Sequence, residues 1–446
     1  MGSDTRVRSS RVSSAAGVLA ACLTVRRVLE SRQVRRSLRA VPSEAPAASG
    51  TGAPGGARVV CVVPMYEETA LAEATVRFWR EVLRAKDVDA VVLVTTAKET
   101  APGGATTHTL LRELLAPGGA AHENLVLLHC EEVCPYRAAQ LDMAVGWARE
   151  RFGPDGDERL WIGVYNADSR PHPDTFGELR TAIGAGPQVR VFQQLVDYVV
   201  PEREGTGAVA AGNAVLQTWW TLSHYVARNE RGLDGGSLWA RTSPFSTFGH
   251  GEFVRADFLQ RIGGFPRYAY ADGLLLGWVA RLAGEPIGLL VNRDVAEVPR
   301  TGRDLVVQQT AWLRGLLNFG VTVDWCRRQG LVRLPDNDVR VLRARHLAIP
   351  VTWGLSTAVV TAGIVAEVRR VIRGRSSAAG LAAMAALAAY PAVPALAATT
   401  RQQSAMGRGR RVAGVLASWP VEGLAFWPAL YGHLRHGQQA PAKTPR

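Results

Sequence analysis

The feature that most constrains the fold is an alternation of short apolar runs with amphipathic stretches over residues 58–165. Such an alternation implies a mostly parallel sheet with helices on both faces. The less regular region 188–300, with a strand near 189–196 and an aromatic helix around 217–228, is predicted to complete the same α/β domain. The alternation predicts strands at 58–64, 88–95, 124–129 and 159–165, and helices at 71–83, 106–115 and 136–151.

The strand predicted at 159–165 stops abruptly at Asn166-Ala167-Asp168, and prolines at 171 and 173 prevent it from continuing. In open α/β sheets, ligands bind in the crevice outside the carboxyl ends of the strands. Asp168 is therefore a candidate ligand for a metal ion that carries phosphates. A simple turn or helix cap explains the same residues, so both interpretations are open on local grounds.

The formal net charge of +13 is unevenly distributed along the chain. Residues 1–57 hold nine arginines and three acidic residues, and residues 339–446 hold fourteen Lys or Arg and two acidic residues, which leaves −5 for residues 58–338. The basic charge thus lies beside the longest apolar runs. This pattern favours contact with a membrane surface and argues against a nucleic-acid groove.

Two uncharged apolar runs, residues 347–366 and 377–399, are long enough to cross a bilayer. A third run at 412–434 contains a glutamate and prolines and is a weaker candidate, suited to the interface. Arginine clusters at 369–375 and 401–411 flank the second run. If both runs crossed the bilayer, one arginine cluster would lie on the outer side, against the usual excess of positive charge on the cytoplasmic side. A re-entrant run and a buried hairpin in a soluble protein therefore stay open as alternatives.

The N-terminal segment combines arginines with an apolar run at 15–25 that is too short to span a bilayer. It is interpreted as an interfacial helix or a loose tail, followed by a Pro/Ala/Gly/Ser-rich linker at 41–56. The sequence therefore predicts a basic N-terminal segment and linker (1–57), a catalytic domain (58–345), and membrane-associated helices with a basic tail (346–446).

Five sequence landmarks follow one another in residues 58–320: VVPMYEE (62–68), VLVTTAKET (92–100), CPYRAAQLDMAV (134–145), NAD (166–168) and GHGEFVRADFLQRIGGFPRYAYADGLLLGW (249–278). The stretch VVQQTAWLRG (306–315) comes after them. Together they resemble the family-two glycosyltransferases of GT-A fold, many of which carry C-terminal membrane helices. The resemblance implies a GT-A catalytic domain, a Rossmann-like and mostly parallel sheet, followed by C-terminal hydrophobic helices. It also implies an inverting transfer of a sugar from a nucleotide donor.

The donor site implied by the resemblance departs from the family pattern at several polar positions. Thr95 and Thr96 replace an acidic pair, and Asn166 leaves Asp168 as the one carboxylate for a Mg²⁺ or Mn²⁺ ion that offsets charge on the diphosphate. Arg137 either meets that diphosphate or lies on a helix surface. The implied donor-binding residues are Pro64, Tyr66, Glu68, Thr95, Arg137, Asn166 and Asp168, with Asp168 as the metal ligand.

The acceptor side of the implied site centres on Asp272, which occupies the position of the catalytic base. A carboxylate there would remove the acceptor's proton during attack, although an aspartate before a helix also serves as a cap. Ala311 replaces the arginine of the family's Q-x-x-R-W element, and Arg314 compensates only if the helix register allows it. The implied acceptor- or diphosphate-binding residues are Gln308, Trp312 and Arg314. His250 and Glu252 lie on alternate positions of G-H-G-E and could form a metal pair, but without a third ligand they are interpreted as acceptor-binding or as structural.

The predicted function is a membrane-associated inverting glycosyltransferase of hexosyltransferase type. It would move a sugar from a nucleotide-diphosphate donor to a lipid-linked or membrane-proximal acceptor, with the catalytic domain on the cytoplasmic side of the cell membrane, in cell-envelope or glycoconjugate biosynthesis, without nucleic acid as a partner. One alternative is a catalytically degenerate binding protein, because four polar positions depart from the pattern. Another is a nucleotidyltransferase on a similar sheet, although that class needs a Gly-rich, basic loop where PMYEETA is acidic.

Overall fold

The structure is a computed structural model of the chain. It describes residues 22, 24–25, 27–29, 31–32, 56–100, 104–116, 124–133, 136–153, 156–200, 207–233, 237–268, 272–375, 377–396 and 400–436, with the backbone alone at 224–233, 272, 401 and 436. Residues 1–21 and nearly all of the predicted linker at 41–56 lie outside this set.

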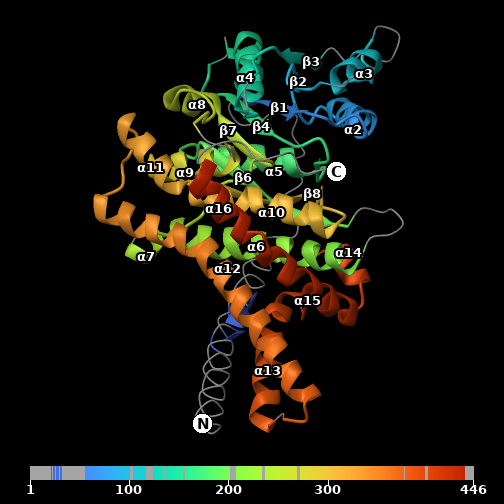
Figure 1. Cartoon of the computed structure of the whole chain (residues 1–446). Helices are drawn as coiled ribbons and strands as arrows, with labels where there is room; N and C mark the ends of the chain where they lie inside the picture. Colours follow the sequence, from blue (N-terminus) through green and yellow to red (C-terminus); the bar gives the residue numbers. More distant parts are fainter. Residues whose placement is uncertain are drawn as a thin grey trace.

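One eight-stranded sheet lies in the upper half of the molecule as seen in Figure 1, in the order β3-β2-β1-β4-β7-β6-β8-β5. The first four strands in this order pair in parallel, whereas β7 runs antiparallel to both β4 and β6. The sheet is therefore mixed, with its parallel half built from the regular N-terminal alternation. The strands are β1 (Arg58–Pro64), β2 (Ala90–Thr96), β3 (Leu125–Cys130), β4 (Leu160–Val164), β5 (Arg170–Pro171), β6 (Val191–Val199), β7 (Glu252–Arg255) and β8 (Ile287–Glu297).

Side chains of β1 alternate between two hydrophobic cores on opposite faces of the sheet. Val60 and Val62 pack with helices α4, α8 and α9, while Val59 and Val63 pack with α2, α3 and α5. This alternation follows from the two-residue repeat of a strand whose two faces are both covered. The helices on these faces are α2 (Ala72–Arg84), α3 (Thr107–Leu114), α4 (Ala138–Phe152), α5 (Thr175–Ala185), α8 (Ala256–Ile262) and α9 (Asp272–Leu282).

A second layer, made of helices, lies below the β6–β8 side of the sheet (Figure 1). Its longest member, α12, has 37 residues and runs away from the sheet to a tip, from which α13 returns. The helices of this part are α6 (Ala208–Leu233), α7 (Leu238–Arg241), α10 (Gly302–Leu317), α11 (Phe319–Arg328), α12 (Asp336–Ile372), α13 (Ala378–Ala392), η2 (Val393–Leu396), α14 (Arg401–Ala405), α15 (Arg408–Leu424) and α16 (Phe426–His436).

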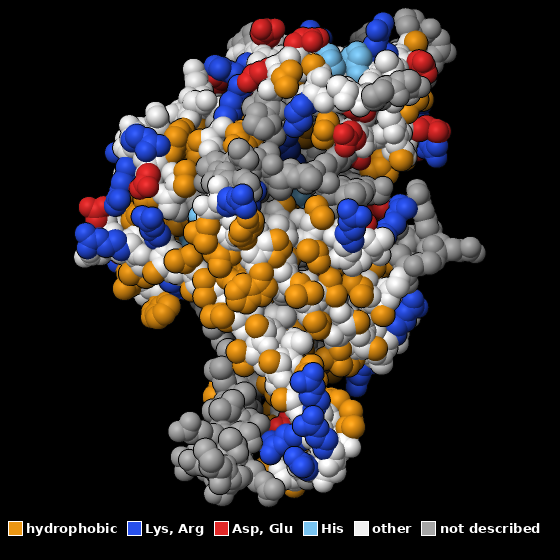
Figure 2. Space-filling view, in the orientation of Figure 1, with side chains coloured by type: hydrophobic (Ala, Val, Ile, Leu, Met, Phe, Trp, Pro, Cys, Tyr) orange, Lys and Arg blue, Asp and Glu red, His pale blue; other side chains and the backbone are white. Residues whose placement is uncertain are grey.

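Two helical stretches of the described chain, Asp336–Ile372 and Ala378–Leu396, are long and apolar enough to cross a membrane by length and composition. Only 28% and 39% of their most apolar windows are buried inside the protein. Figure 2 shows hydrophobic side chains gathered over this region, with arginines at the far tip. Leu355, Val359, Val365 and Val368 of α12 are among the exposed apolar side chains.

The predicted strands and helices of residues 58–165 are confirmed, with bounds that differ by no more than two residues. The helix predicted at 217–228 is part of the longer α6, and the run at 412–434 is divided between α15 and α16. At the N-terminus, the described positions between 22 and 32 are helical, and the Arg27 guanidinium lies 4.1 Å from the centre of the Tyr390 ring. This part of the segment is thus packed against the C-terminal helices.

Candidate active site

A cavity of about 680 Å³ opens beside the carboxyl ends of β1 and β4 and extends between the helices of the second layer. This volume is within the usual range of ligand sites, about 300–1,000 Å³. Its polar wall near the sheet includes Glu67, Glu68, Arg137, Asn166 and Asp168. It is also lined by Tyr198, Leu216, Gln217, Trp220, His250, Gln308, Gln309, Trp312, Leu313, Leu316, Ile349, Trp353 and Glu422, among others.

Arg137 and Asn166, two residues predicted to bind the donor, meet at the cavity wall. Arg137 Nη1 donates to Asn166 Oδ1 at 3.0 Å, and Arg137 Nη2 donates to the carbonyl oxygen of Gly249 at 2.5 Å. Two bonds on different guanidinium nitrogens fix the plane of the group. Arg137 therefore brings a fixed positive charge to the carboxyl end of β4, at the cavity that Asp168 also lines.

The glycine at position 249, in the segment before β7, allows Arg137 to come close to the backbone. Gly249 has a φ of +85°, and a Cβ there would overlap Arg137 Nη2 and lie 3.2 Å from the Cα of Gly273. A Cβ at Gly273 would in turn overlap the backbone of Gly249, and the Thr247 hydroxyl donates to the Gly273 carbonyl. These contacts hold the first turn of α9 against the cavity, which Gly273 lines. Asp272 is the first residue of α9, and its side chain lies outside the described part.

Asp142 of α4 holds the loop that leads into α9. Its Oδ1 accepts from the backbone N–H of Phe265 at 2.7 Å, and its Oδ2 accepts from Arg267 Nε at 2.7 Å. Burial raises the pKa of Asp142, and these hydrogen bonds oppose that rise. Asp142 thus fixes this loop against α4.

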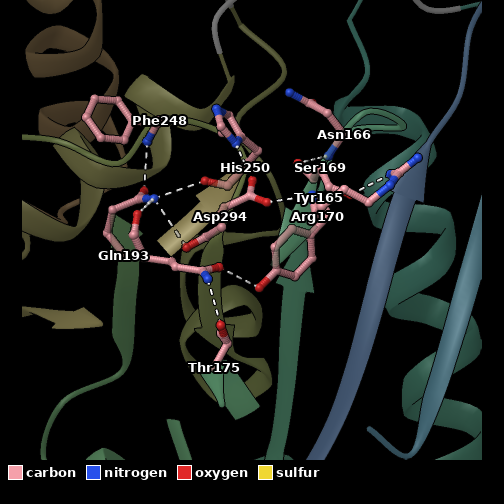
Figure 3. A network of polar contacts seen from close by, with 12 residues as sticks. Tyr165, Asn166, Ser169, Arg170, Thr175, Gln193, Phe248, His250 and Asp294 are labelled. Atoms are coloured by element: carbon pink, nitrogen blue, oxygen red, sulfur yellow. Dashed lines mark hydrogen bonds and ion pairs between the residues drawn. The ribbon is translucent and has the colours of Figure 1, made fainter. Parts of the chain in front are cut away.

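A network of buried polar groups joins β6, β8 and the loop before β7 (Figure 3). His250 Nδ1 lies 3.0 Å from Asp294 Oδ2, and Asp294 Oδ1 accepts from the backbone N–H of Arg170 at 2.8 Å. Gln193 accepts from the N–H of Phe248 at 2.9 Å and donates to the carbonyl of His250 at 2.9 Å. The network fixes both the backbone and the ring of His250, which lines the cavity.

Gln193 and Asp294 were not identified from the sequence as part of the site. Both side chains are fully buried. The signal available was a pair of glutamines inside the apolar run VFQQLV and an aspartate within VNRDVAEV. A buried polar group needs a partner, so polar residues in the middle of predicted strands indicate an internal network.

Of the predicted donor-side residues, the cavity is lined by Glu68, Arg137, Asn166 and Asp168. Within the described chain, Pro64, Tyr66 and Thr95 are not among its lining residues. Thr95 is fully buried at the end of β2, where its hydroxyl lies 2.9 Å from Nδ1 of His108 and 2.9 Å from Nδ1 of His129. The Lys98 ammonium lies 4.7 Å from the centre of the Tyr66 ring.

Of the predicted acceptor-side residues, His250, Gln308 and Trp312 line the cavity. Glu252 is fully buried in β7, and neither it nor Arg314 is among the described lining residues. Arg314 lies against Gly432 of α16, and burial together with its charge lowers the pKa of His433. Arg314 therefore faces α16.

Few side chains at the cavity could ligate a divalent cation. Asp168 is 8% exposed and lines the cavity, whereas Asn166 Oδ1 accepts from Arg137. Among the described residues, no group of three His, Cys, Asp or Glu side chains could hold a metal ion. Mg²⁺ is commonly bound by one or two carboxylates together with substrate phosphates. The residues therefore fit a cation held by Asp168 and mainly by the phosphates of a donor.

Searches of the sequence against protein families and curated proteins find no match. Among solved structures, the chain is similar to mannosyltransferase PcManGT from Pyrobaculum calidifontis in complex with GDP-Man and Mn²⁺, with 17% identity, a TM-score of 0.50, and coverage of 95% of this chain and 99% of that one. Staphylococcus aureus TarS 1–349 matches with 13% identity, a TM-score of 0.40, and coverage of 85% and 92%.

Glucosyl-3-phosphoglycerate synthase from Mycobacterium tuberculosis, in complex with Mn²⁺, UDP and phosphoglyceric acid, matches with 16% identity, a TM-score of 0.37, and coverage of 60% of this chain and 80% of that one. At these identities the similarity concerns the fold. The mixed eight-stranded sheet is of GT-A type and is followed by two C-terminal helices that are apolar enough to be candidate membrane spans.

Proposed function

We propose that the protein is a membrane-associated inverting glycosyltransferase that uses a nucleotide-diphosphate sugar. The observation that carries the proposal is the cavity itself. It brings Arg137, Asn166 and Asp168 together with the first turn of α9, at the carboxyl ends of the parallel strands. Similarity to the fold of a mannosyltransferase crystallised with GDP-Man and Mn²⁺ supports a sugar nucleotide as the donor class.

In this proposal, Arg137 stabilises the leaving diphosphate. A guanidinium held in place by Asn166 and Gly249 needs no rearrangement as negative charge develops on the phosphates. A divalent cation held by Asp168 would supply further charge stabilisation when bound.

Asp272 removes the proton of the acceptor hydroxyl. Asp272 is the first residue of α9, and the next residue, Gly273, lines the cavity. This neighbourhood supports the proposed role of Asp272. A base on the face opposite the leaving group gives inversion at the anomeric carbon. His250, held by Asp294, would hydrogen-bond the acceptor from the neighbouring wall.

The acceptor is proposed to be lipid-linked or membrane-proximal, with residues 346–446 associated with the cell membrane and the catalytic domain on its cytoplasmic side. The support is the exposed apolar surface of α12 and α13 and the arginines near their turn. Exposed apolar surface of this extent marks an interaction site, and arginines beside it suit anionic headgroups.

A thermal-shift screen of nucleotide sugars, with and without Mn²⁺ or Mg²⁺, tests donor binding by the full chain. A donor that binds only the folded protein raises its melting temperature with concentration. We expect at least one nucleotide sugar to give a shift that its matching nucleoside monophosphate does not. Release of a nucleoside diphosphate then separates glycosyl transfer from a binding protein, and release of pyrophosphate would instead indicate nucleotidyl transfer.

A further inference from the structure

The short helix α7 presents two successive apolar side chains on the outside of the catalytic domain. Leu238 is 47% exposed and Trp239 is 71% exposed, although tryptophan is highly buried on average. The next residue, Ala240, is buried. Single exposed apolar side chains are common, so the surroundings of this pair have to distinguish an interaction surface from chance exposure.

Arg345 of α12 holds Trp239 in place. Its Nη1 donates to the carbonyl oxygen of Trp239 at 3.0 Å and to the hydroxyl of Thr242 at 2.8 Å. Its guanidinium carbon lies 4.5 Å from the centre of the Trp239 ring, which is a cation–π contact. Trp239 is therefore fixed against α12 even though most of its surface is exposed.

Two further arginines hold the backbone of α7. Arg281 of α9 donates to the carbonyl oxygens of Ala240 and Arg241 at 3.0 and 2.6 Å. Arg241 in turn donates to Asp338 Oδ2 of α12 at 2.7 Å, and Asp338 is 3% exposed. A surface that is already rigid loses little conformational entropy on binding, so this arrangement suits an interaction surface.

The contacts of Arg345 place α7 beside the start of the longest uncharged run of α12, residues 347–366 (Figure 1). Leu347, the first residue of this run, is 53% exposed. The next arginine along the helix, Arg369, lies 24 positions after Arg345. That is about 36 Å of helix, compared with about 30 Å of hydrocarbon in a bilayer. The run therefore fits between two layers of headgroups, with α7 at the end nearer to the sheet.

We propose that Leu238 and Trp239 form an interfacial anchor, which binds the lipid bilayer at the boundary between headgroups and acyl chains. Tryptophan is enriched at this boundary because its ring is apolar and its N–H is polar. The positive charge of Arg345 suits the anionic headgroups on the same level. A protein partner gives no reason for the position of the pair at the end of an exposed, uncharged run, whereas a bilayer does.

The anchor rests on the membrane association proposed for residues 346–446 and extends it to the catalytic domain. It also sets the level of the cavity relative to the bilayer. Ile349 and Trp353, which line the cavity, follow Arg345 by four and eight positions on α12. They lie about 6–12 Å further along the helix. This short separation suits an acceptor whose lipid part stays in the bilayer.

A fluorescent label on α7 tests the anchor in the full chain, reconstituted in lipid nanodiscs. Leu238→Cys carries the label beside an intact Trp239, and Trp239→Cys carries it at the tryptophan position in a second protein. Both are made in a chain with Cys22 and Cys134 replaced by serine, because the other three cysteines are buried: Cys61, Cys130 and Cys326.

Val133→Cys is the matched control. Val133 is 72% exposed and follows β3, at the end of the molecule opposite to α12 and α13 (Figure 1). Nitroxide-bearing lipids quench the label from the bilayer, and iodide quenches it from water. At positions 238 and 239 we expect lipid quenching at least about threefold stronger, and iodide quenching at least about threefold weaker, than at position 133.

The proposal is overturned if iodide quenches the label at 238 and 239 as strongly as at 133. Protection from both quenchers would also overturn it, because a second copy of the chain or another protein would then cover α7. Flotation of the same proteins with liposomes measures membrane association separately. Proteins that float while their α7 labels stay exposed to water would refute the anchor alone. Proteins that do not float would refute the membrane association in the proposed function as well.

Discussion

Replacement of Arg137 by methionine tests the electrostatic part of the proposed mechanism. The change keeps much of the side chain's length and removes the charge, together with the bonds to Asn166 Oδ1 at 3.0 Å and the Gly249 carbonyl at 2.5 Å. Removing one preorganised donor to a developing anion typically lowers kcat by about 10²–10³-fold, or about 2.7–4 kcal/mol. We therefore expect kcat/KM for nucleoside diphosphate release to fall by about 10²–10³-fold in Arg137→Met.

Arg137→Lys separates charge from geometry, because an ammonium keeps the charge but cannot make both bonds in the plane of a guanidinium. It should retain more activity than Arg137→Met and less than the wild type. Arg149→Met is the matched control, since Arg149 lies on the same helix α4, pairs with Asp157 at 2.7 Å and is not among the described cavity-lining residues. Should Arg137→Met fold normally and keep more than a third of the wild-type kcat/KM, the role given to Arg137 is wrong.

Three further substitutions address the backbone, the cation and a buried carboxyl group. Gly249→Ala places a Cβ at a φ of +85° against Arg137, so we expect a stability loss of about 1–3 kcal/mol and weaker donor binding, measured by thermal unfolding with and without donor. Asp168→Asn removes the one carboxylate of the proposed cation site, and a Mn²⁺ titration of donor turnover should show a half-saturating concentration raised at least about tenfold; an unchanged titration would contradict the site. The pKa of Glu422 is raised from 4.5 to about 8, so the folded state holds a proton that the unfolded state loses above pH 4.5. Stability contributed by this group is therefore lost as pH rises from 4.5 to about 8, by up to about 1.4 kcal/mol per pH unit, and Glu422→Gln should flatten that dependence in chemical unfolding measured across the interval.

The parallel half of the sheet could be predicted because its strands are short apolar runs separated by amphipathic helices. Each strand of this half is covered on both faces, so hydrophobicity alone marks its position. In the mixed half, one strand was predicted, near 189–196, and it corresponds to β6 (Val191–Val199). β7 has only four residues, and the apolar residues of β8 are interrupted by three consecutive polar residues, Asn292, Arg293 and Asp294.

The candidate site was predictable where local sequence determines it. Asn166 and Asp168 follow β4 directly, and the stop after Tyr165 placed them at the carboxyl end of a strand. The bond between Arg137 and Asn166 joins residues 29 positions apart, and the His250–Asp294 contact joins residues 44 positions apart. Such pairs depend on strand register and helix packing, which hydrophobic periodicity does not specify.

Thr95 illustrates the limit of transferring a role by position. The residue lies at the strand end where the resemblance placed a nucleotide contact, but its hydroxyl contacts His108 and His129 in the interior. Arg314 is a similar case, because the register of α10 directs it toward α16. The strand that holds Thr95 was predicted correctly, whereas the surroundings of both side chains depended on tertiary packing.

The most direct test of the central claim is nucleoside diphosphate release by the full chain and by Asp272→Asn, with the donor identified by thermal shift and a hydroxyl-bearing acceptor. If Asp272 is the base, the variant should bind the donor with unchanged affinity while turnover falls by about 10²–10⁴-fold. Turnover within about threefold of the wild type, at equal donor affinity, would contradict base catalysis by Asp272. No diphosphate release by the wild type with any bound donor would contradict glycosyl transfer itself.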